Sequence, residues 1–262
     1  MTDFKIVFLD IDGTTLRPDD TIEQSTRNAI IQLQQKGIEV VLATGRPLHE
    51  IRDIGNELSI TSYIAYNGAI AVHKEDTVFK EPMKPELVEN LVKIAKGNKH
   101  DVVFYTANEN AFTSLEADMV ERFIRTFHLK QNTVYHEREQ VDILGATIIT
   151  TEENSEKRYQ LIEGIHLSQV NVGGMRTCHD VIRDHVNKGV AVKAFLSKVA
   201  CLPENAIAFG DGMNDKEMLS YVGAGFAMGN AHPDLFTFAK YKTTDVNHSG
   251  IFNGLQSLGL VE

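Results

Sequence analysis

Two pairs of acidic residues, far apart in the sequence, carry the strongest chemical signal. Asp10 and Asp12 follow the apolar run Ile6–Leu9, and Asp211 and Asp215 lie in Gly-Asp-Gly-Met-Asn-Asp. Carboxylates two positions apart at a strand end start toward the same side, and they are costly together unless a cation or a proton offsets them. An acidic strand-to-loop turn would explain one pair alone. Four carboxylates converging on one crevice suit a hard cation, and Mg²⁺ is the natural candidate.

Three further polar residues could complete a site for an anionic group: Thr44, Lys188 and Asn214. Each also has a structural explanation when taken alone. Thr44 fits a turn, Asn187 could cap a helix that begins at Lys188, and Asn214 with Glu217 resembles a capping box. Taken together, a nucleophilic carboxylate, a metal, a hydroxyl and an ammonium group around one anion have a chemical logic that the single residues lack.

The elements that would position these residues alternate between strands and helices. Continuous apolar runs are predicted as buried strands: Ile6–Leu9, Ile38–Ala43, Tyr63–Tyr66 and Ile207–Phe209. Helices are predicted between them, one with Ile22, Ala29, Ile30 and Leu33 on one face and a stop at Gly37. This alternation predicts an α/β fold with a doubly wound, Rossmann-like parallel sheet, whose ligands bind at the carboxyl ends of the strands.

The pattern changes near Glu81 and resumes at Lys188, which predicts an inserted domain. The strands expected in between are more amphipathic, as in a sheet with one exposed face. We predict helices around Leu87–Ile94, Val120–Phe127 and Tyr159–Ile165, and strands at Val102–Thr106, at Ile143–Thr150 and twice within Val170–Ile182. The expected domains are a core of 1–81 and 186–262 and an inserted α+β domain of 82–185.

Composition limits the classes of function. The chain has 262 residues with a net charge of −10, so nucleic acid and anionic membrane surfaces are disfavoured as partners. No stretch approaches the ~18 apolar residues of a membrane span, and the N-terminus lacks the basic flank of a signal peptide, which predicts a cytoplasmic protein. Cys178 and Cys201 are too few for a zinc site or a disulfide framework. We expect a monomer or a weak homodimer.

Over essentially its whole length the chain resembles the haloacid dehalogenase-like hydrolases, and within them the Cof-type, subfamily IIB phosphatases. The matching segments, in chain order, are Asp10-Ile-Asp-Gly-Thr14, Ala43-Thr-Gly-Arg46, Asn67-Gly-Ala69, Asn187-Lys-Gly189, Gly210-Asp-Gly-Met-Asn-Asp215 and Ala227-Met-Gly-Asn-Ala231. In some relatives a long insertion lies between the second and third catalytic motifs, which here contain Thr44 and Lys188. In those relatives the insertion forms a cap domain that closes over the crevice. The resemblance therefore implies that residues 82–185 choose the substrate.

The resemblance implies a Mg²⁺-dependent phosphatase for small phosphorylated metabolites such as sugar phosphates. Asp10 would attack phosphorus to give an aspartyl-phosphate, and Asp12 would protonate the leaving alkoxide and then activate water. Mg²⁺ would be held by Asp10, the backbone carbonyl of Asp12, and Asp211, with Asp215 or Asn214 nearby, partly through water. Implied phosphoryl-binding groups are the side chains of Thr44, Lys188 and Asn214 and the amides of Ile11 and Gly45. Arg46 and Asn67 are candidate substrate contacts.

The sequence departs from the family pattern just before the lysine motif. Asp180-Val181 and His185 stand where the family often has Glu-Ile and a glycine. His179, Arg183 and His185 could face the substrate, but exposed polar residues are common on such a domain, so no role is assigned to them.

Two alternatives stay open within the same site. A phosphomutase would return the phosphoryl group to a sugar, and a sugar-phosphate sensor would bind without catalysis, although intact Asp10 and Asp12 argue against a sensor. A receiver-type signalling domain is about half this length and has its acidic pair first and its acceptor later. The phosphorylation domain of a metal ATPase would have Lys-Thr where this chain has Ile11-Asp12.

Overall fold

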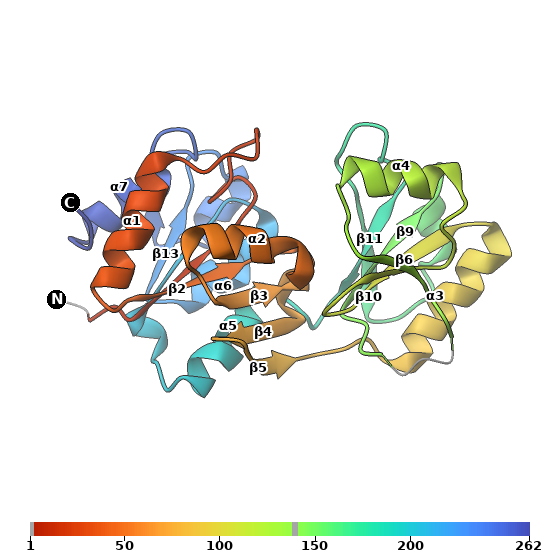
Figure 1. The fold of residues 1–262 in the computed structure, drawn as a ribbon, viewed down its shortest axis with the longest axis horizontal. Coiled ribbons are helices and arrows are strands. Elements are labelled where there is room, and N and C mark those ends of the chain that lie inside the picture. Colours follow the sequence, from red (N-terminus) through yellow and green to blue (C-terminus); the bar gives the residue numbers. More distant parts are fainter. Residues whose placement is uncertain (1–2, 138–140) are drawn as a thin grey trace. The chain divides into compact units, whose positions relative to one another are not determined.

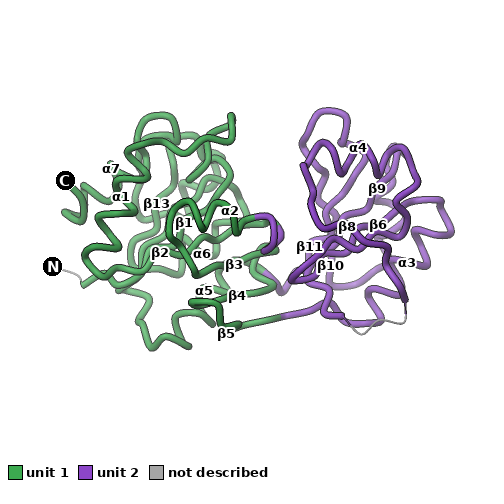
Figure 2. Tube along the Cα trace, in the orientation of Figure 1, with its two compact units in different colours: residues 1–46, 51–80, 187–262 green, residues 47–50, 81–186 purple. Residues whose placement is uncertain are grey.

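The structure, a computed structural model, describes residues 3–137 and 141–262. It divides into two compact units (Figures 1 and 2). Unit 1 comprises Met1–Arg46, Ile51–Lys80 and Asn187–Glu262, and unit 2 comprises Pro47–Glu50 and Glu81–Val186. The chain therefore leaves unit 1 after Lys80 and returns to it at Asn187.

Unit 1 is built on one eight-stranded sheet. Its strand order is β14 (Tyr241–Lys242), β13 (Ala224–Ala227), β12 (Ala206–Gly210), β1 (Ile6–Leu9), β2 (Glu39–Ala43), β3 (Ser62–Ala65), β4 (Ile70–His73) and β5 (Asp76–Lys80). The strands from β14 to β3 are parallel, and β4 and β5 add an antiparallel hairpin. The predicted parallel α/β core is confirmed, whereas the hairpin falls where no element was predicted.

Helices cover the sheet of unit 1 because its strands are apolar on both faces. These helices are α1 (Gln24–Gln35), α2 (Leu48–Leu58, of which Ile51–Leu58 belongs to this unit), α5 (Lys188–Lys198), α6 (Lys216–Tyr221) and α7 (Gly250–Ser257). On one face Phe8 meets Phe195 of α5 edge to face at 5.6 Å, within one buried cluster. Phe209 stacks on Phe226 at 4.7 Å beside Gly254 of α7. The sheet is thus packed against α5 and α7 through buried side chains.

One residue of the expected first helix lies outside it. Ile22 precedes α1 and forms an isolated antiparallel bridge with Leu16. Its side chain is still buried, because the loop after β1 folds back to cover it. The apolar spacing was a correct indicator of burial here, but not of helix.

Unit 2 is built on a six-stranded, largely antiparallel sheet. Its order is β10 (Ile165–Gln169), β11 (His179–Arg183), β9 (Gly145–Ile149), β6 (Asp101–Tyr105), β7 (Asn110–Phe112) and β8 (Asn132–Val134). The side chains of successive residues of β6 pack into two different hydrophobic clusters. Phe104 packs in the cluster that includes Leu91 of α3 (Pro85–Asn98), and Val103 packs in the one that includes Phe123 of α4 (Asp118–Thr126).

The helix predicted around Tyr159–Ile165 is wrong. A short 3-10 helix ends at Arg158, and β10 begins at Ile165. Tyr159 is buried and bonded through its hydroxyl to His100 Nδ1 at 3.0 Å, and Gly164 has a φ of +77°. Of the two strands predicted within Val170–Ile182, one is β11, and the other is displaced, because β10 ends at Gln169.

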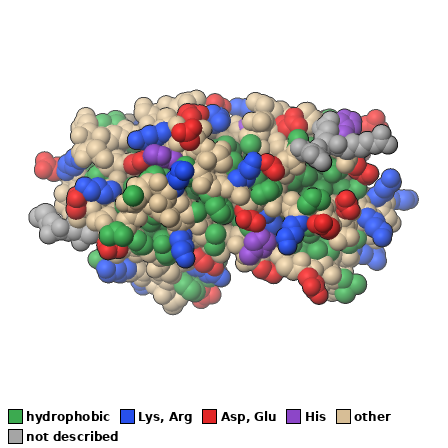
Figure 3. Space-filling model, turned by 90° about the horizontal axis from the view of Figure 1, so that it is seen from below, with side chains coloured by type: hydrophobic (Ala, Val, Ile, Leu, Met, Phe, Trp, Pro, Cys, Tyr) green, Lys and Arg blue, Asp and Glu red, His purple; other side chains and the backbone are tan. Residues whose placement is uncertain are grey.

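Three further properties complete the description. On the face shown in Figure 3, basic and acidic side chains are interspersed. Within the described residues, none of the helices combines the length and the apolar character that a membrane crossing requires. Both cysteines, Cys178 and Cys201, are free thiols.

Candidate active site

The predicted site residues of unit 1 lie where neighbouring strands end. Asp10 follows β1, Thr44 follows β2 and Asp211 follows β12, and β1 pairs with both of the other strands. Lys188 is the first residue of α5, whose N-cap Asn187 accepts a hydrogen bond from the Val190 N–H at 3.0 Å. The predicted cap and the predicted lysine position are therefore both present.

Three carboxylates and one ammonium group form a buried cluster. Oxygens of Asp10, Asp211 and Asp215 all lie within 4.8 Å of one another. Lys188 Nζ donates to Asp10 Oδ1 at 2.5 Å and to Asp215 Oδ1 at 2.6 Å. The side chains of Lys188 and Asp215 are fully buried. One cation thus faces three carboxylates, and the cluster keeps an excess of negative charge.

This excess is visible in the pKa values of the group. Burial, and then the charge of Asp215, raise the pKa of Asp10 well above its ordinary value. The same two causes raise the pKa of Asp211 to about 6. Burial opposes the charge of Lys188, but Asp10 and Asp215 outweigh it and raise its pKa. The carboxylates therefore need a further positive partner to stay fully ionised, and oxygen ligands of this kind suit a divalent cation such as Mg²⁺.

Asp215 also organises the loop that carries Asp211. Its Oδ2 accepts the N–H groups of Asp211 and Gly212 at 3.1 and 3.0 Å, across the 3-10 helix Met213–Asp215. Asn214 is not the capping residue that its spacing to a glutamate suggested, since Asp215 holds the N-cap position of α6. The Asn214 Nδ2 donates to Asn67 Oδ1 at 2.9 Å.

Asp12 lies outside the buried cluster and is paired with Arg46. The guanidinium Nε donates to Asp12 Oδ2 at 2.9 Å and a terminal nitrogen donates to Oδ1 at 2.5 Å, which is the bidentate arrangement. Burial works against the charge of Arg46, but the hydrogen bond and the charge of Asp12 leave its pKa raised. The Arg46 N–H donates to Thr44 Oγ1 at 3.1 Å. Arg46 thus contacts two other predicted site residues.

Ile11 and Gly45, whose amides are candidate phosphoryl-binding groups, also make local contacts. The carbonyl of Ile11 accepts the N–H groups of Thr15 and Leu16 at 2.9 and 2.7 Å, which folds the loop after Asp10. A Cβ at Gly45 would lie 3.0 Å from Asn67 Oδ1.

The Asn67-Gly68 signature has a structural role that spacing alone did not reveal. Gly68 has a φ of +101°, and a Cβ there would lie 2.3 Å from the carbonyl oxygen of Asn187. The glycine lets this loop pack directly against the start of α5, next to Lys188. The signature itself was the available signal, but only the fold shows which segment it touches.

The polar residues singled out in unit 2 make structural contacts. Arg183 donates to the carbonyls of Glu81 and Leu144 at 2.7 and 3.0 Å, and burial lowers its pKa to about 10. His179 Nδ1 lies 3.4 Å from Ser155 Oγ. His185 Nε2 lies 3.8 Å from Glu81 Oε1 and is exposed.

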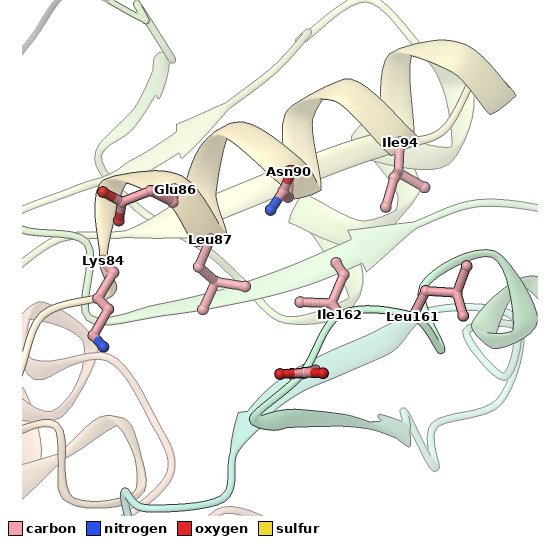
Figure 4. A pocket seen from close by; sticks show the side chains of 8 residues that line it. Lys84, Glu86, Leu87, Asn90, Ile94, Leu161 and Ile162 are labelled. Atoms are coloured by element: carbon pink, nitrogen blue, oxygen red, sulfur yellow. The ribbon is translucent and has the colours of Figure 1, made fainter.

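A groove of about 430 Å³ lies in unit 2 between α3 and the segment that precedes β10 (Figure 4). Leu87 and Ile94 of α3 line one side of it, and Leu161 and Ile162 line the other. Its remaining lining residues are Lys84, Glu86, Asn90 and Glu163. None of these eight is among the predicted site residues.

Comparison with known proteins agrees with this geometry. The family model described as haloacid dehalogenase-like hydrolase matches residues 7–255. YkrA of Bacillus subtilis (strain 168) is 31% identical over 99% of this chain and 100% of its own. A 5-amino-6-(5-phospho-D-ribitylamino)uracil phosphatase, YitU, from the same organism is 26% identical over 94% of each chain. A crystal structure from Geobacillus kaustophilus HTA426 superimposes with a TM-score of 0.90 at 30% identity, covering 98% of this chain and 100% of the other. The chain belongs to the haloacid dehalogenase-like hydrolase family, and is a hydrolase, as its motifs predicted.

Proposed function

We propose that the protein is a Mg²⁺-dependent phosphatase that hydrolyses small phosphorylated metabolites, sugar phosphates among them, through an aspartyl-phosphate. The observation that carries the proposal is the buried cluster of Asp10, Asp211 and Asp215 with Lys188 bonded to two of them. A phosphatase of this kind needs a nucleophilic carboxylate, a cation site and a fixed positive charge within one crevice.

In the first step an oxygen of Asp10 attacks phosphorus, and the bond from phosphorus to the leaving oxygen breaks. Asp12 gives its proton to that oxygen. In the second step water attacks phosphorus, Asp12 takes a proton from the water, and the bond to Asp10 breaks to release phosphate. Lys188 and Thr44 donate hydrogen bonds to the phosphoryl oxygens, whose charge grows in each transition state. Asp12 lies outside the buried cluster, and its side chain is 57% exposed, in contrast to buried Asp10.

The cation site uses this chain's own oxygens. Asp10 and Asp211, with the backbone carbonyl of Asp12, would hold Mg²⁺, and Asp215 or Asn214 would act nearby, partly through water. When bound, the ion would offset the charge of the carboxylates and of the phosphoryl group. The raised pKa values of Asp10 and Asp211 support this assignment, because burial and then the charge of Asp215 disfavour their ionised forms, and a bound cation would favour them.

The substrate class rests on the relatives and on the inserted residues. By its name, YitU removes the phosphate from a phosphorylated ribityl chain. Its substrate is therefore a polyol phosphate. We assign substrate selection to the inserted residues 82–185. Arg46 and Asn67 remain candidates for substrate contacts, although each already contacts another site residue, Asp12 and Asn214 respectively.

The test is phosphate release from a panel of phosphorylated metabolites, with and without Mg²⁺. Unaltered protein is compared with Asp10→Asn, which is nearly isosteric and is checked for folding by circular dichroism. We expect metal-dependent release that is lost in the variant. Undiminished release by Asp10→Asn would contradict the nucleophile. Isomerisation of sugar monophosphates without free phosphate would indicate a mutase.

A further inference from the structure

Asn230, in the Ala227–Ala231 signature, contacts the acidic cluster although no role follows from its motif. It lies just after β13, and its Nδ2 donates to the Gly13 carbonyl at 2.8 Å and to Asp211 Oδ2 at 3.2 Å. Its Oδ1 accepts the Val246 N–H at 2.9 Å. One side chain thus joins three separate segments of unit 1, and one of them carries a carboxylate of the cluster.

The direction of this amide is fixed by its partners. Gly13 O and Asp211 Oδ2 are both acceptors, so the NH₂ group must face them. Val246 offers an N–H, so the oxygen must face that side. The opposite orientation would set an oxygen against two oxygens and an NH₂ against an N–H. Asn230 is therefore a donor to Asp211 by necessity.

Asp211 is held on both of its oxygens. Thr14 Oγ1 donates to Oδ1 at 3.0 Å, and Asn230 donates to Oδ2. The carboxylate also lies against the backbone, since a Cβ at Gly13 would be 2.3 Å from Oδ2. Each oxygen keeps a lone pair beyond these hydrogen bonds. The carboxylate is therefore oriented and can still bind a cation.

We infer that Asn230 is a positioning residue that orients Asp211 for binding of the divalent cation. This inference rests on the proposed function for the ion itself. Groups that hydrogen-bond to metal ligands fix their orientation, and their loss commonly weakens metal binding about 10–100-fold. Because the carboxylate is already ordered, ion binding does not incur the loss of conformational entropy that ordering a free side chain would cause.

Asn253 offers a matched control. Its Nδ2 donates to Thr244 Oγ1 and to the His248 carbonyl at 2.8 and 3.0 Å, so it stabilises the segment around Val246 without contacting Asp211. A variant at this position loosens the same loop but leaves the donor on Asp211 in place.

The test is calorimetric titration of Mg²⁺ into substrate-free protein. We expect Asn230→Ala to bind Mg²⁺ about tenfold more weakly than the unaltered protein, and Asn253→Ala to bind it as tightly as the unaltered protein does. Equal affinity in all three, or equal losses in both variants, would overturn the inference. If the unaltered protein binds no Mg²⁺, the proposed cofactor fails, which is a separate result.

Asn230→Asp provides a second measurement that does not depend on the alanine variant folding well. It keeps the acceptor for Val246 but sets a carboxylate against Asp211. Without Mg²⁺, this repulsion should lower the melting temperature relative to the unaltered protein, and Mg²⁺ should raise it by more than in the unaltered protein. A melting temperature unchanged by the substitution without Mg²⁺ would contradict the contact on which the inference is built.

Discussion

The two units treat buried polar groups differently. In unit 1, Asp10, Asp215 and Lys188 are collected into one cluster that keeps an excess of negative charge. In unit 2, the buried side chain of His100 has local polar partners instead. His100 lies between the Tyr159 hydroxyl and Glu152 at 3.0 and 2.8 Å. Uncompensated buried charge is costly, so its presence in unit 1 marks a candidate functional site.

Lys188→Met should produce the largest loss of stability and activity among these substitutions. It leaves Asp10 and Asp215 buried without their cation, and losing one partner of a buried ion pair typically costs about 3–5 kcal/mol. We expect urea denaturation to show a loss of this size, and phosphate release to disappear. Because a divalent cation would replace part of the lost charge, Mg²⁺ should restore more stability to this variant than to the unaltered protein.

The matched change in unit 2 is Arg183→Met. It frees the carbonyls of Glu81 and Leu144, and buried groups left unsatisfied cost about 1–3 kcal/mol. We expect the same denaturation experiment to show this smaller loss without any extra recovery on adding Mg²⁺. If Mg²⁺ rescued both variants equally, the distinction between the two units would fail.

Two glycines give a smaller contrast. Gly68→Ala would set a Cβ 2.3 Å from the Asn187 carbonyl oxygen at a φ of +101°, so it should cost about 1–3 kcal/mol and lower kcat by displacing Lys188. Gly97, in α3, has nothing within 4 Å of an added Cβ, so Gly97→Ala should gain about 0.5–1 kcal/mol. Thermal melts and phosphate release measure both. A Gly68→Ala protein with normal kcat would contradict the role given to this loop.

The pH dependence of the metal-free protein tests the raised pKa of Asp211. The Asp211 pKa is about 6 in the folded state against an ordinary 3.8, so this carboxyl stabilises the fold fully below pH 3.8 and the contribution is lost as the pH rises through about 6. Protons and Mg²⁺ compete for the same oxygens. The rise in melting temperature caused by Mg²⁺ should therefore grow across this interval, by about 2–4 °C for each ~1 kcal/mol. A rise that is the same at both ends would contradict the raised pKa.

Much of unit 1 could be predicted because its strands are apolar on both faces and end in polar residues. The rule that ligands bind at carboxyl strand ends was enough to bring Asp10, Thr44 and Asp211 to neighbouring strand ends. The pairing of Arg46 with Asp12 could not be predicted, because it depends on the direction of two exposed side chains. Asn230 was missed for a related reason, since its partners come from three distant segments.

Unit 2 was harder to predict where buried and partly exposed residues alternate along a strand, as in β11. Around Tyr159, an apolar spacing that also fits a helix is satisfied by a 3-10 turn and a strand, and the choice is made by the contact with His100. Tertiary contacts of this kind override local patterns. The local pattern likewise does not predict the contacts of Arg183, because its two carbonyl partners lie far away in sequence.

The most direct test of the central claim is to trap the phosphorylated enzyme. Asp12→Asn should still be phosphorylated by p-nitrophenyl phosphate, whose leaving group needs no proton, but it should lose its phosphate slowly. Borohydride reduction followed by peptide mass spectrometry should then find the modification at Asp10, and Asp10→Asn should show none. Turnover by the unaltered protein with the phosphoryl group trapped at another residue, or with none trapped in Asp12→Asn, would contradict the account.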